Sequence, residues 1–489
     1  MSLVIGIDLG TTNCKAVALS AHGEVMATSS STYPLRSPHP GWAEQEAIDV
    51  WDGAVKAVKS IISQVPVNQV AGLCLSGAMH SLLPASKDGE PLTPAMTWVD
   101  QRTRPQAEAL RERIDSHSLY LRTGCPTQPV YHPAKLLWLQ EEAPDIWKQT
   151  ELFLALKDWV VFQLTGKWGT DFAWASATGL LDIHHRVWDE EALNLTEIQP
   201  EQLPPLLLPL TPLGGLRQEA SDLTGLPEGL PIILGSSDGA LANLGSGAYS
   251  PGQNVITVGT SGAVRHILDQ PVLDQKERTW CYILDESKWF RGGTINNAGI
   301  ALQWVRQSFY PEIPNEADYE ELFLEAASIP AGAQGLLFLP YFTGERTPHW
   351  NPGLRGSLHG LRLEHRRGHI ARAILEGVAY CLLDIWEALA ESKPMGDSTR
   401  LTGGITQTPL WGQIVANVLG IQLDVIEAAD ASAIGAAILC QHALGIRTID
   451  DFIRNVKPST TLLQNPEHHL IYQEGYRAFK ELFNRLHRR

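Results

Sequence analysis

The chain has 489 residues, of which 44% are hydrophobic and 19% charged, values that are ordinary for a folded protein of several domains. Its formal charge of −16 and lack of a basic stripe disfavour nucleic-acid binding. No apolar run reaches the roughly 20 residues that cross a bilayer, and the first residues lack the pattern of a secretory signal. We therefore expect a cytoplasmic protein without a membrane or nucleic-acid partner. Its six cysteines are far apart and form no CxxC pair, which argues against a disulfide framework and a structural zinc site.

The N-terminal part predicts strands that alternate with turns. Residues 3–10, "LVIGIDLG", read as a buried strand, and the segment after it as a hairpin that turns at Ala21-His22-Gly23. Residues 44–63 predict a helix, because apolar residues recur at helical spacing. The residues expected on its buried face are Ile48, Trp51, Val55, Val58 and Ile62. Residues 69–81, "QVAGLCLSGAMHS", predict a second buried strand that ends in a polar turn.

The second half again alternates predicted strands and turns, after an extended, proline-rich connection at residues 203–214. Residues 252–268, "GQNVITVGTSGAVRHIL", predict a strand, a turn and a returning strand, as residues 6–17 do. An internal duplication and a chance similarity are equally open at this point. Helices are expected over 368–389, with apolar residues on one face, and from Pro409 to Gly420. A strand at 421–427 and a helix at 432–445 complete an α/β chain that divides near residue 250.

A carboxylate ends the first predicted strand. Asp8 would cost several kcal/mol there unless it were paired or bound to a cation. Gly10 allows a tight turn, and Thr11 and Thr12 offer N–H and O–H donors that suit phosphate oxygens, while Asp8 suits Mg²⁺. A plain β-turn in which Asp8 caps the next element explains this stretch equally well.

Two further turns have related chemistry. Gly259-Thr260-Ser261-Gly262 offers hydroxyl and amide donors without an acid, and Gly403-Gly404 lets a flat ligand approach the backbone closely. Gly403-Gly404 taken singly is best explained as a plain strand-to-helix turn, but three such turns in one chain are much harder to explain as loops and favour nucleotide binding. The chain contains no GxxxxGK[ST] sequence, so a Walker-type site is excluded.

These motifs resemble those of the FGGY carbohydrate kinases, members of the actin/Hsp70/hexokinase-like ATPase superfamily. "DLGTTNCK" and "TVGTSG" are similar to its two phosphate motifs, and "LTGGITQ" to its adenosine motif. Residues 356–380 match the family's C-terminal signature, including Gly360, His369, Glu376 and Gly377. The resemblance implies two ribonuclease-H-like domains with an interdomain catalytic cleft: residues 1–247, mainly sugar-binding with the first phosphate motif, and residues 248–489, mainly ATP-binding.

The same resemblance implies the site residues. ATP would contact Gly10, Thr11, Thr12, Lys15, Gly259, Thr260, Ser261, Gly403, Gly404 and Gln407, with Asp8 holding Mg²⁺. Asp238, in "LGSSDGALANLGSG", would be the catalytic base that takes a proton from the acceptor hydroxyl. We expect the Asp8 and Asp238 carboxylates to face each other across the gap between the domains. Family members are often dimers, so a homodimer is expected.

Sugar binding would involve "SGAMHSLL" and "TWVDQRT", through Met79, His80, Trp98, Asp100 and Arg102. His80 could donate to a substrate hydroxyl or carboxylate, or be a satisfied core histidine. Asp100 and Arg102 could instead form a surface ion pair, and Trp98 could belong to the core. Lys135 resembles a signature lysine of the family, although His132 stands where that pattern has Pro, Ser or Thr.

Local phrases look most like those of the gluconate kinases, notably "AMHSLL", "PLTPAMTWVDQR" and "SDGALANLG". We expect phosphorylation of D-gluconate by ATP, with D-xylulose as the alternative acceptor, because Ala78, Ser81 and Val99 depart from the xylulose kinase pattern. Candidate cations for a substrate carboxylate are Arg102, His80 and Lys135. A non-catalytic sugar sensor and an actin- or Hsp70-like ATPase are remote alternatives.

Overall fold

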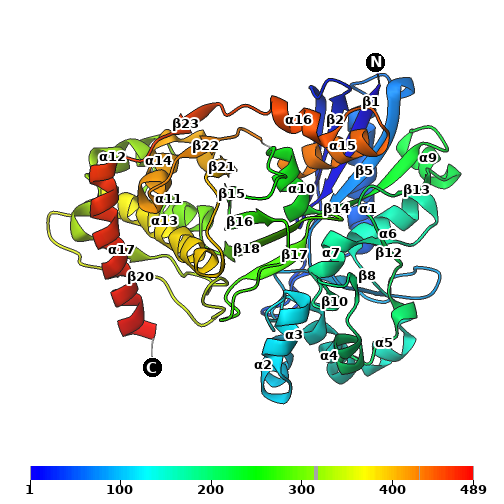
Figure 1. The fold of residues 1–489 in the computed structure, drawn as a ribbon, viewed down its shortest axis with the longest axis horizontal. Helices are drawn as coiled ribbons and strands as arrows, with labels where there is room; N and C mark the ends of the chain where they lie inside the picture. Colours follow the sequence, from blue (N-terminus) through cyan, green and yellow to red (C-terminus); the bar gives the residue numbers. More distant parts are fainter. Residues whose placement is uncertain (1, 313–317, 429, 488–489) are drawn as a thin grey trace.

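Two large β-sheets stand side by side, each flanked by helices (Figure 1). The computed structural model describes residues 2–312, 318–428 and 430–487. The first sheet has the order β13-β14-β5-β1-β2-β3, and the second has the order β17-β18-β16-β15-β21-β22-β23. The strands of the first are β1 (Leu3–Leu9), β2 (Asn13–Ser20), β3 (Val25–Thr32), β5 (Val70–Gly77), β13 (Pro212–Gly215) and β14 (Pro231–Ser237). Those of the second are β15 (Gln253–Val258), β16 (Gly262–Leu268), β17 (Trp280–Ile283), β18 (Trp289–Ile295), β21 (Ser398–Thr402), β22 (Leu423–Val425) and β23 (Thr460–Leu462).

The two sheets repeat one topology. In the first, β1 pairs antiparallel with β2 and parallel with β5, and β14 is parallel to β5. In the second, β15 pairs antiparallel with β16 and parallel with β21, and β22 is parallel to β21. An antiparallel strand, β13 or β23, closes the corresponding edge of each. The α/β prediction is confirmed, and the similarity between residues 6–17 and 252–268 reflects corresponding strand pairs of the two sheets.

Helices surround these sheets, and short strands join the connections. The helices before the second sheet are α1 (Ala47–Ile62), α2 (Arg104–Arg113), α3 (Ser116–Thr123), α4 (His132–Glu142), α5 (Pro144–Gln149), α6 (Leu156–Thr165), α7 (Phe172–Ser176), α8 (Glu190–Leu195), α9 (Gln218–Thr224) and α10 (Asp238–Gly245). The later ones are α11 (Gly299–Phe309), α12 (Glu320–Ser328), α13 (Arg367–Ser392), α14 (Pro409–Leu419), α15 (Ala431–Ala443), α16 (Ile449–Asn455) and α17 (Pro466–His487). None of the helices in the described ranges is both long and apolar enough to span a membrane.

The helix predictions hold with two corrections. Helix α1 forms, but Ile48 is 56% exposed, because the buried stripe runs through Val50, Trp51, Ala54 and Ile61 instead. Helix α13 is longer than expected and is buried on most of its circumference, so it is a core helix rather than a helix with one apolar face. Helix α14 begins at Pro409 and ends before Gly420, whose φ of +70° caps it as predicted.

Helix α15 ties the C-terminal part of the chain to the first sheet. It follows β22 in sequence, yet it lies against the first sheet (Figure 1). Its apolar side chains pack with Val4, Cys74 and Ile233 of that sheet. Contact with α10 is so close that a Cβ added to Gly435 would lie 2.0 Å from the carbonyl oxygen of Leu241. The strands of the two large sheets therefore separate at the division predicted at 247/248. Helix α15 lies after that division in sequence but packs on the sheet formed before it.

Candidate functional site

Asp8 and Asp238 lie at one edge of the first sheet. Strands β1, β5 and β14 are parallel, so their carboxyl ends meet there; Asp8 pairs in register with Ser76, which also pairs with Ser236. Asp238 follows β14 directly and begins α10, whose N-terminus is capped by the Ser237 hydroxyl. The two carboxylates are therefore neighbours, but the expectation that they face each other across the gap between the domains is wrong, because Asp8 lies on β1 and Asp238 directly follows β14 of the same sheet.

The electrostatics of this edge favour a bound cation. Burial and the negative charge of Asp238 raise the pKa of Asp8 to about 6, although the Ser76 hydroxyl donates to its Oδ1 at 2.7 Å. Burial also raises the pKa of Asp238, opposed by the Gly239 amide and the charge of Arg265. A divalent cation would stabilise the ionised forms of these two neighbouring carboxyl groups, which burial otherwise disfavours.

The first predicted phosphate turn is held rigidly. The Gly10 amide donates to Asn13 O at 3.0 Å, and the Tyr33 hydroxyl donates to Gly10 O at 2.7 Å. Thr11 Oγ1 accepts from the indole N–H of Trp98 at 2.8 Å, while Thr12 is exposed. The turn therefore uses the Gly10 amide internally and leaves Thr12 exposed.

Lys15 pairs in register with Asp8, but its Nζ lies 3.0 Å from Oδ1 of Asp430, just before α15. Its charge lowers the pKa of Asp8. In this geometry Lys15 is engaged by a carboxylate of the chain itself, so its predicted contact with ATP would require that ion pair to open.

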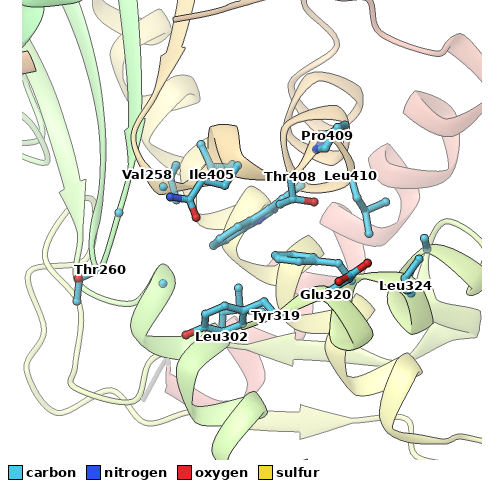
Figure 2. A pocket seen from close by; sticks show the side chains of 17 residues that line it. Val258, Thr260, Leu302, Tyr319, Glu320, Leu324, Ile405, Thr408, Pro409 and Leu410 are labelled. Carbon is cyan, nitrogen blue, oxygen red and sulfur yellow. The ribbon is translucent and has the colours of Figure 1, made fainter. Parts of the chain in front are cut away.

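The second and third turns meet at a cavity of about 630 Å³ (Figure 2). Thr260 lies at one end, the segment from Ile405 to Leu410 forms one wall, and Leu302 and Tyr319 form the other. Gly259, Phe323, Gly404, Gln407 and Trp411 also line the cavity. Such a slot, apolar with a polar rim, suits a flat heterocycle. Gln407 and Gly404 line this cavity, and their contact with ATP stays a prediction.

Gly403 does not line this cavity. Its φ is +93°, and a Cβ there would lie 2.5 Å from the carbonyl oxygen of Val258 on β15. The glycine is required by the approach of the two strands, so the prediction that Gly403 admits a ligand to the backbone is not supported, whereas Gly404 lines the cavity.

A second cavity, of about 800 Å³, lies between segments on either side of residue 250. Trp98, Gln128 and Val130 line it from the N-terminal side, and Thr260, Ser261 and Arg346 from the C-terminal side. The Arg346 guanidinium stands 4.9 Å from the centre of the Trp98 ring, and its Nε donates to Asn296 Oδ1 at 2.7 Å. Trp98 therefore belongs to the wall of a cleft, as the sugar-binding motif predicts.

His80 lies beside this cleft in a constrained conformation, with a φ of +68°. Its Nδ1 lies 2.8 Å from Ala177 O, which can only accept a hydrogen bond, so Nδ1 carries the proton. Burial and the charges of Lys135 and Arg346 lower the pKa of His80 to about 3. The ring is neutral, and its Nε2 can accept from a substrate hydroxyl but cannot serve as a cation for a carboxylate.

Met79, which precedes His80 in the chain, lies close to Asp238 and Gly239. Its Cε lies 3.0 Å from where a Cβ on Gly239 would stand, and its backbone amide lowers the pKa of Asp238. The short segment of Met79 and His80 thus runs directly past the proposed base, as expected of a substrate-binding loop.

Asp100 and Arg102 form a buried ion pair. The Arg102 side chain is 4% exposed; its Nη2 bonds Asp100 Oδ2 and Glu44 Oε1, each at 2.7 Å. Its guanidinium stacks on Trp42, 3.5 Å from the ring centre, and the Asp100 side chain also accepts from the Ala43 amide. These donors and acceptors are used within the protein, so the geometry argues against the predicted substrate contacts and also against a surface ion pair.

Lys135 is also internal. Its Nζ donates to the backbone oxygens of His80, Met96 and Thr97, and the residue is fully buried. It therefore ties the His80 loop to the segment before Trp98. Neither Lys135 nor Arg102 is free to bind a substrate carboxylate.

The residues of the C-terminal signature support the core rather than the site. Glu376 accepts from Arg372 Nε at 2.7 Å and from the Tyr472 hydroxyl at 3.0 Å. Gly377 is required because a Cβ would lie 2.3 Å from Phe338 O. These contacts fix helix α13 against its neighbours.

Sequence reasoning missed two arginines of the site, Arg265 and Arg346, together with the Tyr319–Phe323 wall. Arg265 is a charged residue within the otherwise apolar start of a strand, "GAVRHIL", and that interruption was a usable signal. Arg346 lies in an irregular loop, where no periodicity points to it.

Comparison with known proteins agrees with this geometry. Residues 3–245 and 254–444 match the N-terminal and C-terminal domains of the FGGY family of carbohydrate kinases. The chain is 36% identical over 459 residues to the gluconokinase of Bacillus subtilis, covering 92% of this chain and 89% of that protein. It is 32% identical over 450 residues to the xylulose kinase of the same organism, covering 91% and 89%.

Solved structures of a xylulose kinase and a gluconate kinase are also similar to this chain. A ligand-bound xylulose kinase from Lactobacillus acidophilus superimposes with a TM-score of 0.95, and a gluconate kinase from that organism with a TM-score of 0.94. Each is 30% identical to this chain and covers 99% of it and 98% of its own chain.

Proposed function

The chain belongs to the FGGY family of carbohydrate kinases, and we propose that its acceptor is D-gluconate, which it converts with ATP to 6-phosphogluconate. The two-domain carbohydrate kinase fold and the use of ATP follow from the family. The acceptor is the new element, because gluconokinases and xylulose kinases are both among its relatives.

The observation that carries the proposal is the guanidinium of Arg346 in the cleft, which has no carboxylate partner in the described part of the chain. Among the described residues only its Nε has a hydrogen-bond partner, and none of their carboxylates lies within 4.0 Å of its nitrogens. Burial lowers the pKa of Arg346 although Glu345, Tyr131 and Tyr282 act to raise it, so the charged guanidinium is costly at this position. A sugar acid could supply the missing carboxylate in a bidentate pair, whereas a neutral sugar such as xylulose could not.

Asp8 fits a metal ion, and we propose that it holds Mg²⁺. One of its oxygens is bonded to Ser76, and the other has no hydrogen-bond partner among the described residues. Those residues contain no group of three or more His, Cys, Asp or Glu that could hold a metal, so phosphate oxygens and water would complete the coordination. Mg²⁺ would supply neutralisation of the phosphate charge during transfer.

The remaining roles follow from position. Asp238 lies at the sheet edge beside Asp8 and would accept the proton of the acceptor hydroxyl. Neutral His80 would accept from a second hydroxyl and Trp98 would cover a C–H face. Thr11, Thr12, Thr260 and Ser261 would donate to phosphates, whereas the Gly10 amide is already bonded to Asn13 O, so its predicted contact with ATP is not supported. The 630 Å³ cavity would hold the adenosine. We propose residues 1–247 and 248–489 as the two domains that close on these substrates.

The test is the replacement of Arg346 by methionine. Loss of a buried charge pair costs about 2–5 kcal/mol, so kcat/KM for gluconate should fall at least about 30-fold, while that for D-xylulose changes little. The control is Arg111→Met, because Arg111 lines the same cavity but lies on α2. Equal losses for both acceptors, or an equal loss in the Arg111 variant, would contradict the assignment of Arg346 to a substrate carboxylate.

A further inference from the structure

A second arginine reaches the proposed base from the other sheet. Arg265 lies on β16, four residues after the turn residue Ser261, and its side chain belongs to the face of the second sheet that meets α10. A Cβ on Gly239 would lie 3.7 Å from Arg265 Nε, so the guanidinium stands next to the residue that follows Asp238. It is therefore a cation contributed across the domain junction to the reacting end of the cleft.

Among the residues that the structure describes, the Arg265 guanidinium makes one hydrogen bond. Its Nη1 donates to Thr257 Oγ1 at 3.1 Å, and Thr257 Oγ1 lies 3.0 Å from Thr402 Oγ1. Its Nε is buried without a hydrogen bond, and within the described ranges no carboxylate oxygen lies within 4.0 Å of it. A guanidinium so placed is held in position from one side and leaves donors for an anion on the other.

Arg291, on the adjacent strand β18, is the natural comparison. It pairs in register with His266 rather than with Arg265, so it points to the opposite face of the sheet. Its Nη2 donates to Lys393 O and contacts His266, so its donors are used inside the protein. Of these two arginines, Arg291 therefore has a structural role, whereas Arg265 keeps its Nε without a hydrogen bond beside Gly239.

We propose that Arg265 is a catalytic residue that binds the phosphoryl group during its transfer. In this step the acceptor oxygen forms a bond to the γ-phosphorus and the hydroxyl proton passes to Asp238. The bond from phosphorus to the bridging oxygen breaks, and its electron pair leaves on ADP. Negative charge on the transferring oxygens lies beside the base, where Arg265 can donate to it. The inference rests on the kinase activity of the proposed function and does not depend on which sugar is the acceptor.

The two arginines therefore have separable roles. Arg346 stands with Trp98 and His80, toward the non-reacting end of the acceptor, whereas Arg265 stands with Asp238 at the reacting end. The phosphoryl contact of Arg265 would be made with every acceptor, whereas the carboxylate contact of Arg346 would be made only with a sugar acid. Kinetics with one acidic and one neutral acceptor therefore distinguishes the two roles.

The experiment compares Arg265→Met, Arg265→Lys and Arg291→Met with D-gluconate and D-xylulose. We expect kcat of Arg265→Met to fall about 10²–10³-fold for whichever acceptors the unmodified protein phosphorylates, with KM for ATP nearly unchanged. Lysine should restore part of the loss, and Arg291→Met should keep its kcat. Binding of ADP with aluminium fluoride and acceptor, which mimics the transferring group, should weaken by a similar factor in Arg265→Met.

Should Arg265→Met fold poorly, Arg265→Ala assayed with added guanidinium chloride at millimolar concentration should regain turnover. Loss confined to KM for gluconate would overturn the proposal in favour of a carboxylate contact, and so would an unchanged kcat or an equal loss in Arg291→Met. If the unmodified protein prefers D-xylulose, gluconate is refuted as the acceptor. The effect of the Arg265 variants on kcat can still be interpreted in that case.

Discussion

Glu345 precedes Arg346, and its titration should make folding stability depend on pH. The side chain is 3% exposed, and burial raises its pKa from 4.5 to about 7. Its Oε1 accepts from the amides of Asn296 at 2.6 Å and Arg346 at 2.8 Å. Between pH 4.5 and 7 the unfolded chain has released this proton and the native state has kept it, so stability falls as pH rises. At about 1.36 kcal/mol per pKa unit, the fall attributable to this group is about 3 kcal/mol.

Glu345→Gln removes this titration and keeps an oxygen for the two amides. Relative to the unmodified protein, the variant should gain about 3 kcal/mol between pH 4.5 and 7. Urea unfolding at half-unit pH steps measures this difference. Glu481→Gln on α17 is the control, because that side chain is 70% exposed. A stability difference that stays constant across this range would refute the reasoning that Glu345 is protonated in the native protein.

The remaining predictions concern the base, the acceptor loop and the helix that joins the two sheets. Asp238→Asn should lower kcat about 10²–10⁴-fold while calorimetry shows ATP bound as before; retained turnover would exclude Asp238 as the base. The His80 ring should remain neutral from pH 5 to 8 in nitrogen NMR spectra, because its pKa is about 3, and a titration near pH 6.5 would contradict its buried geometry. Gly435→Ala should destabilise the protein by about 1–3 kcal/mol in thermal unfolding, because the added Cβ overlaps Leu241 O; an unchanged Tm would show that α10 and α15 can separate at no cost.

Much of the fold could be predicted from local patterns in the sequence. Buried strands that end in glycine and hydroxyl residues marked β1 and β15, and Pro409 and Gly420 marked the ends of α14. These features depend on short-range backbone preferences, so they can be read from the sequence. The face of α1 was misjudged at Ile48 because alanines, which carry little periodic signal, make up part of its buried stripe.

The site was harder to read where long-range packing decides the role of a side chain. Arg102 and Arg265 are both arginines near motif residues, yet one is neutralised by Glu44 and Asp100 while the other has no carboxylate partner in the described structure. Partners such as Glu44 lie 58 residues away, and no spacing rule joins them. The relation of Asp8 to Asp238 depended likewise on the order of strands in the sheet.

The central claim is that this cleft holds a sugar acid whose hydroxyl is phosphorylated at Asp238. The most direct measurement is the rate of ADP release by the unmodified protein with ATP, Mg²⁺ and one acceptor at a time: D-gluconate, D-xylulose, L-ribulose or glycerol. The account predicts the highest kcat/KM for D-gluconate. A kcat/KM for D-xylulose about ten times that for gluconate, a difference of about 1.4 kcal/mol in transition-state stabilisation, would contradict it.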